Sequence, residues 1–260
     1  MRRLTFLPLL LSLFACAKSE PDAVGGTVEK HAAAGKAVVQ MHAPVADYLA
    51  ALDSVEKSKT PGSLEPLFDK AEAAQGALME ITGGEDGKAV MEAYDEASFT
   101  ALQDQVRGLK LRRGLDIYAQ PDPVFFLALA KVHGTPADIA FFTQYAATWG
   151  PDDVPVYLKL RPQPSPCVRF GEGRIAPLYA GWQAFATQHP STYAQRAQQN
   201  LRDLEEAVAL GTCACEGLES VRSEQAGFLK QFPATPKSAE IKARQAQLAS
   251  DPEAMPVNCR

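Results

Sequence analysis

Apolar residues recur every three or four positions over most of this chain, which is the period of one face of an α-helix. The clearest example is residues 27–59, whose expected buried face carries Val38, Met41, Val45, Leu49, Leu52 and Val55. Pro44 lies inside this pattern, so a kink or a junction between two helices is expected there. The same spacing predicts a shorter helix over residues 64–81 and another over residues 88–109, whose far end is weakened by Gly108.

The middle of the chain predicts a hairpin of two helices. Residues 124–132 are almost wholly apolar, and periodicity alone does not separate a helix from a buried strand in such a run. A helix is favoured because the residues that follow are those typical of the start of a second helix. Thr135 is a capping residue, Pro136 suits the first helical position and Asp138 suits the third. The second helix is expected to reach Trp149.

Residues 167–259 contain the same unit twice. The segment Phe-x-x-Gln-His-Pro that starts at Phe185 returns as Phe-x-x-Gln-Phe-Pro at Phe228, 43 residues later, an offset in the range of helical-hairpin repeats. In each copy a helix is expected to end before the proline, and a hydroxyl side chain, Ser191 or Thr235, is expected to cap a second helix. Each copy therefore predicts an antiparallel helical hairpin.

This repeated turn, followed by an alanine-rich helix, resembles the tetratricopeptide-like (TPR-like) repeats of periplasmic lipoproteins and cell-envelope assembly factors, over about residues 175–250. The resemblance implies an all-α fold in which antiparallel helical hairpins stack as a short α-solenoid and bind protein partners, with no catalytic residues to transfer. Two copies are fewer than such an array usually needs, so a helical region at residues 27–150 is expected to supply the remaining packing. The proline-rich residues 151–166, with one short extended piece at residues 155–160, are expected to connect that region to the repeat pair at residues 167–260.

The chain begins with a charged and then an apolar segment, residues 1–15, which together are too short to cross a bilayer as a permanent helix. Residues 13–16, Leu-Phe-Ala-Cys, resemble the lipobox of bacterial lipoproteins. That resemblance implies a cleaved signal peptide, attachment of acyl chains such as palmitate at Cys16, and a polar tether at residues 16–26. Ala17, in place of an aspartate, implies the outer membrane, facing the periplasm. The alternative is an ordinary signal peptide whose cleavage site lies near Cys16.

Beyond Cys16 the chain has four cysteines, Cys167, Cys213, Cys215 and Cys259, and an even number in an exported protein predicts two disulfides. In a stack of antiparallel hairpins all four lie at the same end. The order-preserving pairs Cys167–Cys213 and Cys215–Cys259 are expected, and the crossed pairs Cys167–Cys215 and Cys213–Cys259 are the alternative. A Cys213–Cys215 bond would close a strained small ring. A metal or redox site is a further alternative for the Cys-x-Cys pair, although no histidine lies within twenty residues of it.

Charge and motifs limit the chemistry that this chain can carry. The formal net charge of −5 becomes −7 without the two arginines of the leader, so nucleic acid is not an expected partner. No motif predicts a nucleophile or a phosphate-binding loop, and neither a metal nor a cofactor is expected. The histidines, His31, His42, His133 and His189, are scattered along the sequence. The aromatic residues of the central and first repeat helices are expected to be mostly core: Phe125, Phe126, Phe141, Phe142, Tyr145, Trp149, Tyr179 and Trp182.

Three functional hypotheses follow. The leading one is an envelope lipoprotein that binds another protein through a helical surface, as a scaffold or assembly factor, held at the membrane by its lipid anchor and without catalytic activity. The second is a periplasmic immunity or inhibitor lipoprotein that neutralises a toxic effector or hydrolase. The third, an enzyme acting on cell-wall sugars or peptides, is weaker because no motif supports it.

Overall fold

The computed structural model describes residues 42–80, 95–113, 117–150, 154–161, 166–211 and 213–250, and this part of the chain is mostly helical, as predicted. The helices are α2 (Ala43–Lys57), α3 (Glu65–Glu80), α5 (Glu96–Gln105), α6 (Pro123–His133), α7 (Pro136–Thr148), α8 (Ile175–Gln188), α9 (Ala194–Leu210), α10 (Leu218–Gln231) and α11 (Ser238–Ser250). Two small antiparallel sheets accompany them, formed by β1 (Leu109–Arg113) with β2 (Ile117–Pro121) and by β3 (Leu158–Lys159) with β4 (Cys167–Val168).

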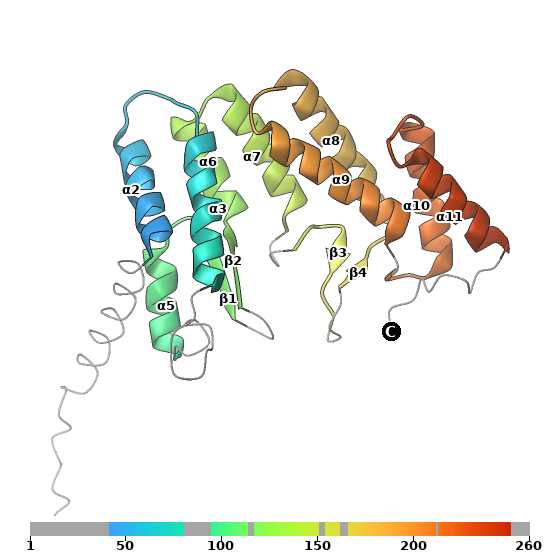
Figure 1. Cartoon of the computed structure of the whole chain (residues 1–260), viewed down its shortest axis with the longest axis horizontal. Helices are drawn as coiled ribbons and strands as arrows, with labels where there is room; N and C mark the ends of the chain where they lie inside the picture. The colour runs from blue at the N-terminus through green and yellow to red at the C-terminus, as the bar shows by residue number, and fades with distance from the viewer. Residues whose placement is uncertain are drawn as a thin grey trace, which may run out of the picture.

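Consecutive helices pair as hairpins and follow one another in an arc (Figure 1). α2 packs on α3, α6 on α7, α8 on α9 and α10 on α11, while α7 also packs on α8 and α9 packs on both α10 and α11. Both small sheets lie on the lower side of this arc in Figure 1, β1–β2 near α3 and β3–β4 below α9. Each hairpin therefore buries its apolar faces against its neighbours in chain order.

One continuous core runs through these hairpins. It extends from Val45 in α2 to Leu248 in α11 and includes buried side chains on both sides of the proline-rich connection. The ring of Phe68 in α3 makes edge contacts with a set of rings in α6 and α7, namely Phe126, Phe141, Phe142 and Tyr145. The N-terminal helices and the repeat pair thus share buried apolar surface, which is the main stabilising contribution in a helical array.

The predicted helix start at Thr135 is confirmed. The Thr135 hydroxyl accepts a hydrogen bond from the Asp138 backbone N–H, and the Asp138 carboxylate accepts one from the Thr135 N–H, which together form a capping box. Pro44 lies in the first turn of α2, where a proline needs no backbone donor. A helix starts at this proline, so a kink within one continuous helix is wrong. The alternative of a junction between two helices stays a prediction, because residues 27–41 lie outside the described residues.

The helix predicted over residues 88–109 is shorter in the structure. α5 ends at Gln105, and the chain then turns into β1 at Leu109. The turn requires Gly108, whose φ of 78° lies in the left-handed region that glycine adopts without steric cost. The Tyr48 hydroxyl donates to the Arg107 carbonyl at 2.6 Å and ties this turn to α2. Helical spacing in residues 88–109 thus gave the wrong structure for its last part.

The two repeat copies have the same turn after their first helices. His189 after α8 has φ −130° and ψ 62°, and Phe232 after α10 has φ −127° and ψ 64°. The N–H of each donates to the carbonyl of the phenylalanine four residues earlier, at 2.8 Å in both copies. The 43-residue offset therefore corresponds to a repeated backbone geometry.

The predicted caps of the second repeat helices are wrong. α9 begins after Tyr193, which adopts a left-handed φ of 50° and makes no side-chain cap, so Ser191 lies in the preceding turn. α11 begins at Ser238, and the buried Thr235 hydroxyl donates to Glu205 at 2.8 Å instead of capping. In the second copy a tertiary hydrogen bond of the buried Thr235 has replaced the local cap, and in the first the buried Tyr193 occupies the N-cap position while Ser191 is exposed.

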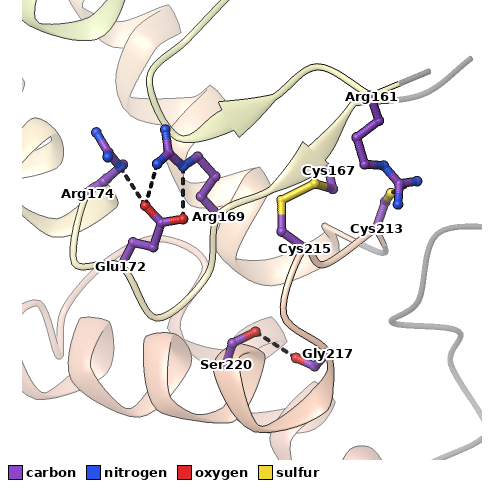
Figure 2. Close-up of a disulfide and its surroundings, with 9 residues drawn as sticks. All are labelled: Arg161, Cys167, Arg169, Glu172, Arg174, Cys213, Cys215, Gly217 and Ser220. Carbon is purple, nitrogen blue, oxygen red and sulfur yellow. Dashed lines mark hydrogen bonds and ion pairs between the residues drawn. A yellow bond between two sulfur atoms is a disulfide. The ribbon is translucent and has the colours of Figure 1, made fainter. Parts of the chain in front are cut away.

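The described disulfide joins Cys167 to Cys215, with a Cα–Cα distance of 5.1 Å (Figure 2). The expected Cys167–Cys213 pair is therefore wrong, and the crossed alternative is correct for this bond. Residues 213–215 run beside β4, held by the Val168 N–H, which donates to the Cys213 carbonyl, and by the Cys215 N–H, which donates to the Val168 carbonyl. Cys213 is disulfide-bonded as well, whereas Cys259 lies outside the described residues.

Replacing Gly108 with alanine should lower the free energy of unfolding by about 2–4 kcal/mol, as measured by urea denaturation. The added Cβ would overlap the Tyr48 hydroxyl and the Phe125 ring, and φ would remain left-handed. Gly227→Ala is the matched control, because its Cβ would meet no atom within 4 Å inside α10 and should raise the free energy of unfolding by up to about 1 kcal/mol. Equal effects of the two substitutions would contradict the role given to Gly108.

Non-reducing peptide mapping should recover Cys167 joined to Cys215 and, by the crossed scheme, Cys213 joined to Cys259. The Cys167–Cys215 bond spans 48 residues, so it should stabilise the fold by about 3–4 kcal/mol through restriction of the unfolded chain. Reduction should therefore lower the melting temperature by several degrees. A peptide joining Cys167 to Cys213 would show that the crossed scheme is wrong.

Candidate ligand pocket

A pocket of about 210 Å³ opens between α3, β2, α7 and α9. Its aromatic lining comes from three of these elements: Phe68 of α3, Tyr118 of β2, and Phe141, Tyr145 and Trp149 of α7 and its C-cap. Its polar lining comes mainly from α3 and α9. α3, α7 and α9 are the second helices of three consecutive hairpins, so the pocket lies on one face of the array.

The three helices that form the pocket are joined at their N-terminal ends by Asp138. This carboxylate is fully buried and accepts hydrogen bonds from the Leu64 N–H at 2.9 Å, from the Tyr193 hydroxyl at 2.7 Å and from the Thr135 N–H at 2.7 Å, with the Thr135 hydroxyl at 2.5 Å as a fourth donor. A buried charge is tolerated only when it is well hydrogen-bonded, and helix N-termini favour a negative charge. Asp138 therefore holds the starts of α3, α7 and α9 together.

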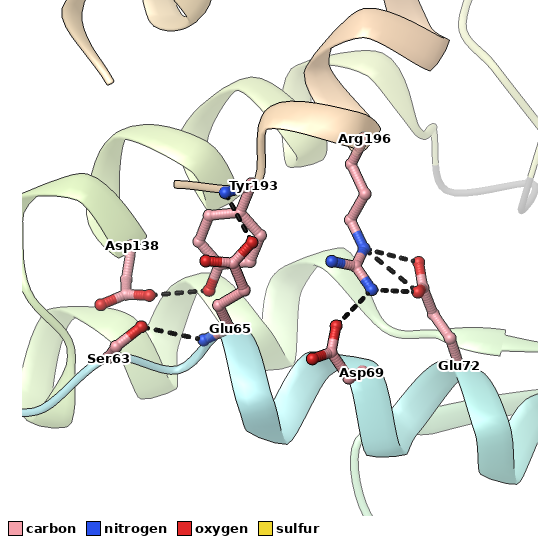
Figure 3. Close-up of polar contacts among 7 residues, drawn as sticks. All are labelled: Ser63, Glu65, Asp69, Glu72, Asp138, Tyr193 and Arg196. Carbon is pink, nitrogen blue, oxygen red and sulfur yellow. Dashed lines mark hydrogen bonds and ion pairs between the residues drawn. The ribbon is translucent and has the colours of Figure 1, made fainter. Parts of the chain in front are cut away.

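Tyr193 fixes α9 to both partner helices (Figure 3). Its ring stacks on Phe141 with centroids 3.8 Å apart, its hydroxyl donates to Asp138, and its backbone N–H donates to Glu65 at 2.7 Å. Burial, and then the hydrogen bond to the Asp138 carboxylate, raise the pKa of Tyr193 far above its ordinary value. The hydroxyl thus remains a donor at any pH at which the protein is studied.

Arg196 closes the pocket beside this junction, one turn into α9 (Figure 3). Its guanidinium donates to Glu72 and to Asp69 of α3 and lies over the ring of Phe68 at 5.1 Å. Burial alone would lower the pKa of Arg196, but the hydrogen bonds to Glu72 and Asp69 outweigh it and raise the pKa. The pocket therefore contains a permanent cation whose charge is already compensated by two carboxylates.

Two polar side chains of the pocket have hydrogen-bonding capacity that no described residue satisfies. Gln120 is only 3% exposed; its Oε1 accepts from the Tyr118 hydroxyl at 2.7 Å, but its Nε2 has no acceptor there. Tyr145 is 8% exposed, and its interactions are ring contacts, so its hydroxyl forms no hydrogen bond with the described residues. Burial raises the pKa of Tyr145 well above its ordinary value, which keeps the hydroxyl protonated.

A second buried polar cluster lies deeper in the repeat pair and is structural. Glu205 of α9 accepts from the Tyr179 hydroxyl at 2.5 Å and from the Thr235 hydroxyl at 2.8 Å, which links α8, α9 and the turn before α11. Burial, followed by the hydrogen bond to Glu205, raises the pKa of Tyr179. None of these three residues lines the pocket.

The lining of the pocket includes neither the described cysteines nor the described histidines, His42, His133 and His189. Cys167, Cys213 and Cys215 lie together beside β4, while Cys16 and Cys259 are outside the described residues. The other described side chains with metal-ligand potential are dispersed: no group of three His, Cys, Asp or Glu in the described ranges is placed to hold a metal ion. The Cys-x-Cys pair therefore serves disulfide bonding.

The aromatic cluster divides between core and pocket. Phe126 and Phe142 are buried core residues, whereas Tyr145 and Trp149 also line the pocket. The residues that sequence reasoning missed are polar: Gln120, Tyr118 and Arg196. Gln120 belongs to no motif and is followed by Pro121 at the end of an unpredicted strand, so no sequence signal marked it.

No protein family, curated protein or solved structure matches this chain, so comparison with known proteins does not suggest a function for the pocket. Among the described helices, none has both the length and the apolar character needed to cross a membrane. Interpretation of the pocket therefore depends on its geometry.

Proposed function

We propose that this chain is a lipid-anchored protein of a bacterial cell envelope that binds a protein partner through a short TPR-like array of helical hairpins, without catalysing a reaction. The observation that carries the proposal is the arc of consecutive hairpins with a turn repeated at 43 residues (Figure 1). Arrays of this kind present one extended, curved face made by equivalent helices, which suits the binding of a large partner.

The chemistry of the pocket favours binding over catalysis. Its carboxylates are Glu72, which pairs with Arg196, and Asp203, which accepts from Gln199 at 2.6 Å. Serine, threonine, cysteine, histidine and lysine are all missing from its lining within the described residues. Nucleophilic and general-base mechanisms need a nucleophile or base within hydrogen-bond reach of its activating group, and this lining offers no such pair.

The anchoring part of the proposal comes from the leader and from Cys16, which lie outside the described residues. Residues 16–26 are mostly polar in sequence and would act as a tether between the folded part and acyl chains at Cys16. The disulfide Cys167–Cys215 agrees with an oxidising compartment such as the periplasm.

Cys16→Ser should release the protein from the outer membrane into the soluble periplasmic fraction, because a lipid-anchored chain without its acyl site has no other expected attachment. Fractionation after a high-salt wash measures this, with the native chain as the control. A Cys16→Ser chain that stays with the outer membrane would contradict the anchoring proposal.

Partner binding can be tested by cross-linking the full chain in envelopes, which should capture one partner in stoichiometric amount. Gly181→Leu should weaken capture, because the added side chain would displace the Gln144 amide and break its hydrogen bond to the Leu178 carbonyl, which links α7 to α8. Gly227→Leu is the matched control, since its Cβ meets open space on α10. Equal capture by both variants, or hydrolysis of peptidoglycan by the purified chain, would contradict the proposal.

A further inference from the structure

An unpaired buried amide in the pocket points to a ligand. Native proteins pair nearly all buried donors and acceptors, and Gln120 Nε2 is an exception within the described residues. The Tyr145 hydroxyl, which also forms no hydrogen bond with the described residues, belongs to the same cavity. Both residues are more than nine-tenths buried, and they come from different elements, β2 and α7. We propose that the pocket binds one uncharged sugar unit, either free or within a glycan chain. This proposal is independent of the protein partner proposed above.

The charges around the pocket select a neutral ligand. An anion would meet a cation, Arg196, that already pairs with two carboxylates, and would also meet Asp203 on the exposed rim. A cationic group could offer no acceptor to Gln120 Nε2. A purely apolar ligand would leave the buried Gln120 Nε2 unpaired, at its full desolvation cost. A neutral molecule rich in oxygen avoids all three penalties.

Hydroxyl groups fit the hydrogen-bonding pattern because a hydroxyl both donates and accepts. One sugar hydroxyl can accept from Gln120 Nε2, and another can pair with the Tyr145 hydroxyl in either direction. Asn200 donates its Nδ2 to the Arg196 carbonyl at 2.9 Å, so its Oδ1 remains as an acceptor on the α9 side. The pocket thus offers donors from β2, an acceptor from α9 and a hydroxyl from α7.

The size and aromatic wall of the pocket suit one ring. Its volume of about 210 Å³ is below the roughly 300–1,000 Å³ of sites for drug-sized ligands. Trp149 is half-buried at the pocket and lies 6.0 Å from the Tyr145 ring. The apolar C–H face of a pyranose can lie against such an aromatic wall while its hydroxyls reach the polar side.

Tryptophan fluorescence of the full chain tests this proposal, because the chain has two tryptophans and one of them lines the pocket. Trp182 is fully buried and donates to the Thr148 hydroxyl at 2.9 Å, so it should not respond. Glucose and N-acetylglucosamine should produce a saturable change with a Kd of about 1 mM or tighter. The cationic glucosamine and the anionic glucuronate should bind at least about threefold more weakly. Trp149→Phe should remove the response.

Two variants test the residues that carry the argument. Tyr145→Phe removes a hydroxyl that has no partner in the described residues, so it should keep the melting temperature and weaken sugar binding about three- to tenfold. Gln120→Met should weaken binding by at least about tenfold. Gln225→Met is the matched control: Gln225 is also a fully buried glutamine with one unpartnered amide atom, but it lies between α9 and α10, outside the pocket lining.

The trisaccharide chitotriose separates the two sources of a sugar unit. If chitotriose binds more tightly than N-acetylglucosamine, the bound sugar unit belongs to a glycan chain. If it binds equally or more weakly, the ligand is a free sugar. The proposal is overturned if neither neutral sugar gives a saturable response, if a charged sugar binds as tightly, or if Tyr145→Phe and Gln120→Met both bind like the native chain.

Discussion

The carboxylate of Asp138 is buried in the apolar interior and accepts four hydrogen bonds from segments far apart in the sequence, at Leu64, Thr135 and Tyr193. An unpaired charge at this depth would cost several kcal/mol, so these segments must meet whenever the protein folds. Each segment is the start of a second hairpin helix, and the partial positive charge of the N-termini of α3 and α7, whose first backbone N–H groups donate to the carboxylate, adds to its stabilisation. The arc depends on this junction because it spans the proline-rich connection.

The candidate pocket is a consequence of the same junction. α3, α7 and α9 all start at Asp138, and the pocket residues lie one to three turns further along each helix: Phe68, Glu72 and Gln75 on α3, Phe141, Tyr145 and Trp149 on α7 and its cap, and Arg196 to Asp203 on α9. The ion pairs of Arg196 hold α9 to α3 on one side of the opening, while β2 supplies Gln120 on another. A partner-binding face and a small-ligand pocket can therefore share one rigid framework.

Local signals in the sequence predicted where helices start and end, but not the contacts between segments that are far apart in the chain. The capping box of Thr135 and Asp138 predicted the start of α7, and the repeated Phe-x-x-Gln turn predicted two equivalent helix ends. The second oxygen of that same Asp138 binds groups 55 and 74 residues away, which no local pattern contains. The β1–β2 hairpin was missed because its strands are only five residues each and the helical spacing was extended to Leu109, the first residue of β1. Cys167 paired with Cys215 because residues 213–215 run beside β4.

A double-mutant cycle between Asp138→Asn and Tyr193→Phe tests the central claim, that one buried carboxylate joins the N-terminal helices to the repeat pair. Urea unfolding should show one cooperative transition in each protein, a loss of about 3 kcal/mol or more for Asp138→Asn, and a coupling of about 1–3 kcal/mol between the two substitutions. Additive losses, or separate unfolding transitions for the fluorescence of Trp149 and Trp182 in the native chain, would contradict the claim.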